Sequence, residues 1–316
     1  MSVVGLGCWQ LGADWGRVDD ADAIAVLHAA VDAGVTFLDT ADVYGDGRSE
    51  QLIARFLAER DAPVTVATKC GRRADPHVPA SFTPENLRAW TDRSRVNLRT
   101  ERLDLVQLHC PPTPVFGTDE VFDALDDLVA QGHLAAYGVS VETCDEALTA
   151  IARPHVATVQ IILNAFRRKP LERVLPAARE AGIGIIARVP LASGLLSGTY
   201  DEHTTFAADD HRNYNRHGEA FDVGETFSGV PFDVGVHAAR ELAAIAEGLG
   251  VSTAALALRW VMDQPGVSVV IPGARNAEQA NANAAASALA PLSADTLRAI
   301  EQVYDDRIRE HVHERW

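Results

Sequence analysis

Short apolar segments of strand length recur eight times along the chain, and amphipathic segments of helical length separate them. The expected strands show little apolar/polar alternation, as is typical of strands covered on both faces. They are Val3–Gly7, Thr36–Leu38, Val64–Thr68, Leu103–Leu108, Leu134–Val139, Ala157–Ile161, Gly184–Ala187 and Val267–Ile271. Strands that alternate with helices predict an α/β protein with a parallel sheet. Eight such units favour a closed (β/α)8 barrel, the TIM barrel, over an open sheet.

The residues at the ends of the amphipathic segments support the helical interpretation. The segments include Asp20–Ala33, Ser49–Glu59, Pro84–Asn97, Asp119–Gln131 and Leu171–Ala181. Thr83 followed by a proline is typical of a capped helix start, and Ser293 is expected to cap another helix. Gly34 and Gly182 each follow a helical segment, and a glycine in this position typically ends the helix.

One connection is unusually long. After the seventh expected strand, the chain from about Ser193 to Phe232 is polar and contains five interspersed aromatic residues, Tyr200, Phe206, Tyr214, Phe221 and Phe227. A long loop without its own secondary structure is usually functional or disordered. We therefore expect a lid on the active-site face, whose aromatic residues line a pocket; the alternative is a surface insertion without a role. The C-terminal segment Asp305–Trp316 either lies over the barrel or frays.

Composition and charge narrow the function classes. The chain has 316 residues, of which 47% are hydrophobic, and residues 1–316 are expected to form a single barrel domain. Its formal net charge of −16 opposes binding to nucleic acid or to an anionic membrane surface. No apolar run is long enough to cross a bilayer, and no secretory signal is recognisable. The four scattered cysteines form neither a disulfide framework nor a zinc motif, so we expect a cytoplasmic protein without a metal.

Polar side chains with catalytic potential stand at three consecutive strand ends. The second strand ends in Asp39, the third in Lys69 and the fourth in His109. Tyr44 follows Asp39 by five residues. In a (β/α)8 barrel these ends form one rim, where active sites lie. The sequence therefore predicts that a carboxylate, an ammonium, an imidazole and a phenol meet there.

These four residue types suit the protonation of a carbonyl oxygen. Lys69 is expected to lower the pKa of Tyr44 and make it a usable general acid, while Asp39 keeps Lys69 charged. His109 is expected to hold the carbonyl oxygen by a hydrogen bond. Taken singly, each residue could be structural, as a turn cap, a surface charge, a turn aromatic or a core histidine. The four types on adjacent strand ends favour the catalytic interpretation.

A second set of residues follows the last expected strand. No GxGxxG motif signals a Rossmann site, but the sequence Ile-Pro-Gly-Ala-Arg-Asn runs into a helix. Gly273 permits close approach of the backbone, and the start of the helix favours an anion. Arg275 adds a positive charge that could hold the 2′-phosphate of NADPH. The alternative is a capped helix with a surface arginine.

The motifs around these residues resemble those of the aldo-keto reductase family, bacterial type, over nearly the whole chain. They are FLDTADVYGDGRSE, VATKCG, LVQLHCPP and IPGARNAEQANAN. The resemblance implies a (β/α)8 barrel, a nicotinamide cofactor and a catalytic tetrad of Asp39, Tyr44, Lys69 and His109. It also implies that Ser140 and Gln160 hold the carboxamide of the cofactor, and that Gln279 and Asn283 face its adenosine end. Trp9, with Trp15 as a second candidate, would line the substrate pocket.

The sequence departs from the family pattern at Arg188, where many relatives have a tyrosine that stacks on the nicotinamide. An arginine could stack there too, or meet a phosphate. Many relatives also have a lysine after Ile-Pro; Arg275 would replace it, so the cofactor is expected to be NADPH, with NADH possible.

We therefore expect a reductase that converts a small aldehyde or ketone to the alcohol, and its oligomeric state stays open. One alternative is a regulatory or redox-sensing subunit with the same barrel, which binds NADPH but turns over slowly. Another is a metal-dependent hydrolase or isomerase, but the first strand lacks the His-x-His pair that would support it.

Overall fold

Eight parallel strands form one sheet in which each strand pairs with the next along the chain. The structure is a computed structural model, and it describes residues 1–12, 18–60 and 62–316. The strands are β1 (Leu6–Gly7), β2 (Phe37–Asp39), β3 (Thr65–Cys70), β4 (Leu103–His109), β5 (Leu134–Ser140), β6 (Val156–Ile162), β7 (Gly184–Arg188) and β8 (Val267–Val270). Each overlaps a segment predicted from the hydrophobic pattern.

Backbone hydrogen bonds between the first and last strands close the sheet. Gly5 N donates to Val270 O at 2.8 Å, and Val270 N donates to Val3 O at 2.9 Å. Gly7 N continues this pairing by donating to Pro272 O at 3.0 Å. The predicted (β/α)8 barrel is therefore confirmed.

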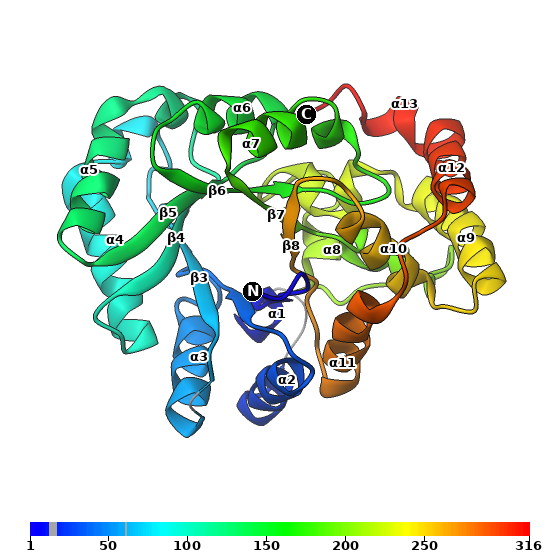
Figure 1. Cartoon of the computed structure of the whole chain (residues 1–316), viewed down its shortest axis with the longest axis horizontal. Helices are drawn as coiled ribbons and strands as arrows, with labels where there is room; N and C mark the ends of the chain where they lie inside the picture. The colour runs from blue at the N-terminus through cyan, green and yellow to red at the C-terminus, as the bar shows by residue number, and fades with distance from the viewer. Residues whose placement is uncertain (13–17, 61) are drawn as a thin grey trace.

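Helices surround the strands on the outside of the barrel (Figure 1). They are α2 (Asp20–Asp32), α3 (Arg48–Glu59), α4 (Pro84–Leu98), α5 (Asp119–Ala130), α6 (Cys144–Ile151), α7 (Val174–Ala181), α9 (Phe232–Gly248), α10 (Thr253–Met262), α11 (Ala277–Ala285) and α12 (Ala294–Val303). The expected caps are present: the side chains of Thr83 and Ser293 accept from the backbone N–H groups of Asn86 and Thr296. Gly182 ends α7 with a left-handed φ of 72°, which glycine adopts at little cost.

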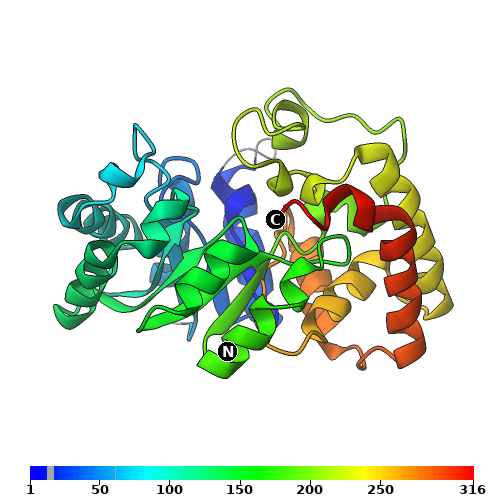
Figure 2. The ribbon, with the colours of Figure 1, turned by 90° about the horizontal axis from the view of Figure 1, so that it is seen from above.

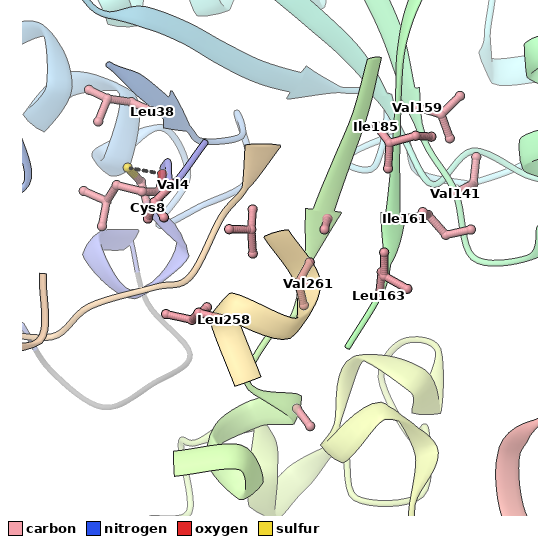
Figure 3. Close-up of a cluster of buried hydrophobic side chains, with 14 of the residues drawn as sticks. Val4, Cys8, Leu38, Val141, Val159, Ile161, Leu163, Ile185, Leu258 and Val261 are labelled. Carbon is pink, nitrogen blue, oxygen red and sulfur yellow. Dashed lines mark hydrogen bonds between the residues drawn. The ribbon is translucent and has the colours of Figure 1, made fainter. Parts of the chain in front are cut away.

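Alternate strand positions divide the core into two parts, because successive side chains of a strand point to opposite faces. Inside the barrel a small cluster contains Phe37, Ala67, Leu105, Ile186, Val269 and Ile271. The large cluster joins the outward faces of the strands to the helices. Figure 3 shows part of it, with Ile185 of β7 and with Leu258 and Val261 of α10. The barrel interior is thus a packed core, and only the rim is free for chemistry.

The connection between β7 and α9 is long, but it is not the structureless loop that the sequence suggested. It contains the short helices η4 (Ala192–Ser197), α8 (His211–Tyr214), η5 (Val223–Glu225) and η6 (Phe227–Gly229). Its aromatic residues explain this order, because Phe206 and Phe227 pack on Phe232 at centroid distances of 5.9 and 5.0 Å. Figure 2 shows this yellow-green segment rising at one end of the barrel.

The C-terminal segment packs against this connection. After α12 the chain continues through η8 (Tyr304–Ile308) and α13 (Arg309–Val312). The indole N–H of Trp316 donates to Asp222 at 3.1 Å, and its ring lies 3.9 Å from the guanidinium of Arg167. These contacts hold the C-terminal segment against Asp222 of the connection and against Arg167, which follows β6.

Among the helices of the described residues, none is by itself long and apolar enough to cross a membrane. Helices α9 and α10 pass that test only as a pair, and they are bent by 88° relative to each other.

Candidate active site

Three of the predicted catalytic residues meet at the rim of the barrel. The ammonium of Lys69, at the end of β3, donates to Asp39 Oδ1 at 2.5 Å and to Thr40 O at 2.9 Å. It also lies 3.3 Å from the hydroxyl oxygen of Tyr44. The side chains of Lys69 and Asp39 are 1% and 4% exposed, so their charges interact in a medium that screens them weakly.

Two glutamines hold the second oxygen of Asp39. The amide Nε2 of Gln160 donates to Asp39 Oδ2 at 2.7 Å, and that of Gln107 donates to the same oxygen at 3.2 Å. Hydrogen bonds to both oxygens hold the carboxylate of Asp39 in one orientation. Gln160 Nε2 also donates to Gln107 Oε1 at 3.2 Å. Its N–H groups are therefore used within the site, and its carbonyl oxygen is left for the cofactor carboxamide that it was predicted to hold.

The pKa of Tyr44 depends both on Lys69 and on the burial of the phenol. Burial raises the pKa of Tyr44 above its ordinary value of 10, and the nearby Lys69 charge only opposes this rise. Burial alone would lower the pKa of Lys69, but Asp39 and Tyr44 outweigh it and raise that pKa. Lys69 thus lowers the pKa of Tyr44 as predicted, but the cost of burying a phenolate is larger and makes the net shift upward. Tyr44 is protonated and Lys69 is charged at neutral pH, as a proton donor beside a cation requires.

His109, at the end of β4, lies beside Tyr44. The two rings meet edge to face at a centroid distance of 5.9 Å. Burial, followed by the positive charges of Arg72 and Lys69, holds the pKa of His109 well below its ordinary value. The imidazole is therefore neutral. Its buried Nδ1 has no hydrogen-bond partner among the residues that the structure describes, and His109 lines the cavity described below.

Two glycines set the position of Tyr44. A Cβ atom on Gly12 would lie 2.5 Å from the carbonyl carbon of Tyr44. Gly45 has a φ of 61°, and a Cβ atom there would lie 2.7 Å from Gly12 O. Only glycine permits this close approach, and it holds the turn that carries Tyr44 against the end of the short helix α1 (Trp9–Gly12).

Asp42 is a buried carboxyl in the same turn. Neither of its oxygens has a hydrogen-bond partner within the described ranges. Burial, with the neighbouring charge of Glu50, raises the pKa of Asp42 to about 7. Near neutral pH the carboxyl of Asp42 is therefore protonated in part of the molecules. It lies two residues before Tyr44 in the sequence.

This carboxyl should make the folded protein less stable as the pH rises. Folding raises the pKa of Asp42, so the folded state binds its proton more tightly, and the free energy of unfolding falls between about pH 4 and pH 7. The asparagine of Asp42→Asn does not titrate. The free energy of unfolding of this variant, relative to that of wild type, should therefore increase by more than about 1 kcal/mol when the pH is raised from 5 to 8. Urea denaturation of both proteins at the two pH values checks this. A constant difference would mean that Asp42 does not titrate in this range.

The tetrad opens into a cavity of about 620 Å³, a size suited to a small-molecule site. Besides the tetrad residues Asp39, Tyr44 and His109, the lining includes Trp9 and seven residues predicted to bind the cofactor, Ser140, Gln160, Arg188, Gly273, Arg275, Gln279 and Asn283. From the described connection after β7, Tyr200 and Phe221 line it, whereas Phe206, Tyr214 and Phe227 do not.

The far end of the cavity is a turn before α11. Gln279 Oε1 accepts from the backbone N–H of Arg275 at 2.9 Å, and Asn283 Nδ2 donates to Gly273 O at 3.0 Å. Asn276 caps α11 by accepting from the N–H of Gln279. Both predicted adenosine contacts therefore also shape the turn, and the guanidinium of Arg275 is exposed beside it. A helix start with a neighbouring arginine fits an anionic group.

Comparison with known proteins agrees with this geometry. The family model described as "Aldo/keto reductase family" matches residues 3–305. The chain belongs to the aldo/keto reductase family.

Three relatives illustrate the extent of the similarity. Aldo-keto reductase YhdN of Bacillus subtilis is 32% identical over 295 residues, which cover 89% of this chain and 83% of the relative. The glycerol dehydrogenase AKR11B4 from Gluconobacter oxydans has a TM-score of 0.80 and 30% identity, with 100% and 94% of the two chains covered. An aldo-keto reductase from Klebsiella pneumoniae, solved in complex with NADPH, has a TM-score of 0.71 and 25% identity, with 96% and 90% covered. This aldo-keto reductase is accordingly an NAD(P)H-dependent oxidoreductase.

Arg188 of this aldo-keto reductase is held by carboxylates. Its Nη1 donates to Glu225, and its Nη2 donates to Val141 O at 2.9 Å and lies 3.4 Å from Glu142 Oε2. Ligand atoms of Cys110, Glu142 and Glu225 lie within 4.8 Å of one another, a spacing that suits a metal ion. The guanidinium of Arg188 contacts all three, so it already supplies the positive charge there.

Of the two tryptophans predicted to line the substrate pocket, Trp15 lies outside the described residues. Trp9 stacks on Tyr44 at a centroid distance of 5.9 Å, as a wall of the predicted substrate pocket requires.

Several residues around the site were not predicted. Arg72, Glu225 and Gln107 belong to the site but were missed. Gln107 carried a usable signal, because it is a polar residue within the apolar strand that ends in His109.

Proposed function

We propose that the protein reduces a small aldehyde or ketone to the alcohol, with NADPH as the reductant and Tyr44 as the proton donor. The observation that carries this proposal is the arrangement of the tetrad. A protonated phenol lies 3.3 Å from an ammonium, which is fixed by a buried carboxylate at 2.5 Å, and a neutral imidazole lies beside the phenol.

Each residue has a separate part in the reaction. His109 and the Tyr44 hydroxyl bind the carbonyl oxygen, and Tyr44 transfers its proton to that oxygen as negative charge develops. Lys69 stabilises the phenolate that Tyr44 becomes, and Asp39 keeps Lys69 in place. Trp9 and Phe221 exclude water from one side of the substrate.

The residues of the cavity fit a nicotinamide dinucleotide. Ser140 and the free carbonyl oxygen of Gln160 would hold the carboxamide near Tyr44, and the turn from Gly273 to Arg275 would hold the phosphates. When bound, NADPH supplies the hydride. Arg275 beside the start of α11 supports NADPH over NADH, because its guanidinium can bind a 2′-phosphate by two parallel hydrogen bonds.

A panel of aldehydes and ketones, followed by NADPH and NADH absorbance at 340 nm, tests the proposal. We expect consumption of NADPH with at least one class of small carbonyl compounds, slower consumption of NADH, and no effect of a chelator. Tight binding of NADPH without consumption across the whole panel would instead support the regulatory or sensing subunit with the same barrel. Activity that a chelator removes would support the metal-dependent alternative.

A further inference from the structure

A guanidinium with uncommitted donors lies over the proposed reaction centre. Arg72 follows β3 by two residues, and its Nη1 lies 3.7 Å from Oε1 of Glu142, which follows β5 by two residues. Strand β4, which ends in His109, lies between these strands. The side chain of Arg72 therefore crosses the end of β4 and lines the cavity that contains Tyr44 and His109.

The hydrogen-bonding capacity of Arg72 is unused. Among the described residues it makes no hydrogen bond; its contacts are the long ion pair with Glu142 and the face of Phe221, 5.6 Å from the guanidinium. Its side chain is 24% exposed, and Arg72 is one of the residues that line the cavity. A guanidinium has five N–H donors in a planar fork, so it can bind a carboxylate by two parallel hydrogen bonds.

The other arginines of the cavity are occupied or distant. Arg188 is paired with Glu225 and bonded to Val141 O. Arg212 is bonded to both carboxylate oxygens of Asp210 and to the hydroxyl of Tyr200. Arg275 lies at the far end, beside α11. Among the arginines of the described residues that line the cavity, Arg72 is thus the one beside the tetrad that makes no hydrogen bond.

We propose that Arg72 binds a carboxylate of the substrate, so that the preferred substrates are aldehydes or ketones that carry a carboxylate. This inference rests on the proposed carbonyl reduction. A singly charged carboxylate fits better than a phosphate dianion, because Glu142 and Glu225 lie close by and repel a second negative charge more strongly. The carboxylate would lie on Arg72, and the carbonyl would lie between Tyr44 and His109.

Matched substrate pairs test this assignment. Succinic semialdehyde is compared with butanal, and 4-formylbenzoate with benzaldehyde, so that each pair differs chiefly in the charge. For wild type we expect kcat/KM to be at least about tenfold higher for the acid of each pair. In Arg72→Met this ratio should fall by about 10- to 100-fold, the range for a hydrogen bond to a charged group, and mainly through KM. Arg72→Lys, which keeps the charge but loses the fork, should give an intermediate ratio.

Arg73→Met is the matched control, because Arg73 is the next residue and pairs with Asp46 at 3.1 Å outside the cavity. It should leave the ratio as in wild type. Equal kcat/KM for acid and uncharged aldehydes in wild type, or an equal loss for both in Arg72→Met and Arg72→Lys, would overturn the assignment. If Arg72→Met does not fold, Arg72→Lys alone decides it.

A third pair, glyceraldehyde 3-phosphate and glyceraldehyde, tests whether Arg72 binds a phosphate instead of a carboxylate. A preference for the phosphorylated substrate larger than that for the carboxylates would overturn the choice of carboxylate. If wild type reduces none of these compounds while other carbonyl compounds are reduced, only this inference fails. If no carbonyl compound is reduced at all, the proposed function itself fails.

Discussion

Tyr44→Phe is expected to lower kcat for aldehyde reduction by a factor of about 10² to 10⁴, the range for loss of a general acid. The phenylalanine ring keeps the stacking on Trp9 but has no proton to give to the carbonyl oxygen. Steady-state kinetics with NADPH and a substrate from the panel measure the loss. Titration of NADPH by fluorescence should show binding within about threefold of wild type, since the phenol acts on the substrate.

Tyr137→Phe is a suitable control for this experiment. Its hydroxyl donates to Asp126 at 2.8 Å, away from the cavity, so its loss should cost some stability and leave kcat near the wild-type value. Undiminished turnover in Tyr44→Phe would remove Tyr44 from the role of proton donor.

The second large effect is expected at the buried ion pair. Lys69→Met leaves Asp39 without its cation, and Asp39→Asn leaves Lys69 without its anion. Each single variant should lose about 3–5 kcal/mol of the free energy of unfolding, the usual cost of an uncompensated buried charge. The double variant should be more stable than either single variant, because it buries no charge. All three should lose reductase activity.

Urea denaturation at pH 7 measures these differences. Lys169→Met serves as the control, because Lys169 forms a 3.4 Å ion pair with the exposed Glu314 and a surface pair contributes at most about 1 kcal/mol. If the double variant were no more stable than the singles, charge burial would not explain the loss, and packing of the lysine stem would become the cause.

Much of the site was predictable because a barrel converts sequence order into spatial order. Once the segments that end in Asp39, Lys69 and His109 are strands of one parallel sheet, their ends must share a rim. The eight strands were also readable, since strands covered on both faces leave short apolar runs in the sequence. The start of α11 after Gly273 and Arg275 also followed from the local sequence.

The parts that could not be predicted depend on contacts between distant segments. Arg188 is paired with Glu225, 37 residues further along the chain, and no local pattern indicates that pairing. The sign of the pKa shift of Tyr44 depends on how deeply the phenol is buried, which residue types alone do not reveal. The order in the connection after β7 comes from Phe206 and Phe227, which form a small core with Phe232 instead of facing a ligand.

The burial of Lys69 has a consequence for how the protein tolerates its own proposed substrates. Aldehydes attack proteins by condensing with unprotonated primary amines to form imines. The sequence contains two lysines, Lys69 and Lys169, and Asp39 keeps Lys69 protonated, without a lone pair for that reaction. A surface whose positive charge comes almost wholly from arginine therefore offers a reactive aldehyde few sites for cross-linking.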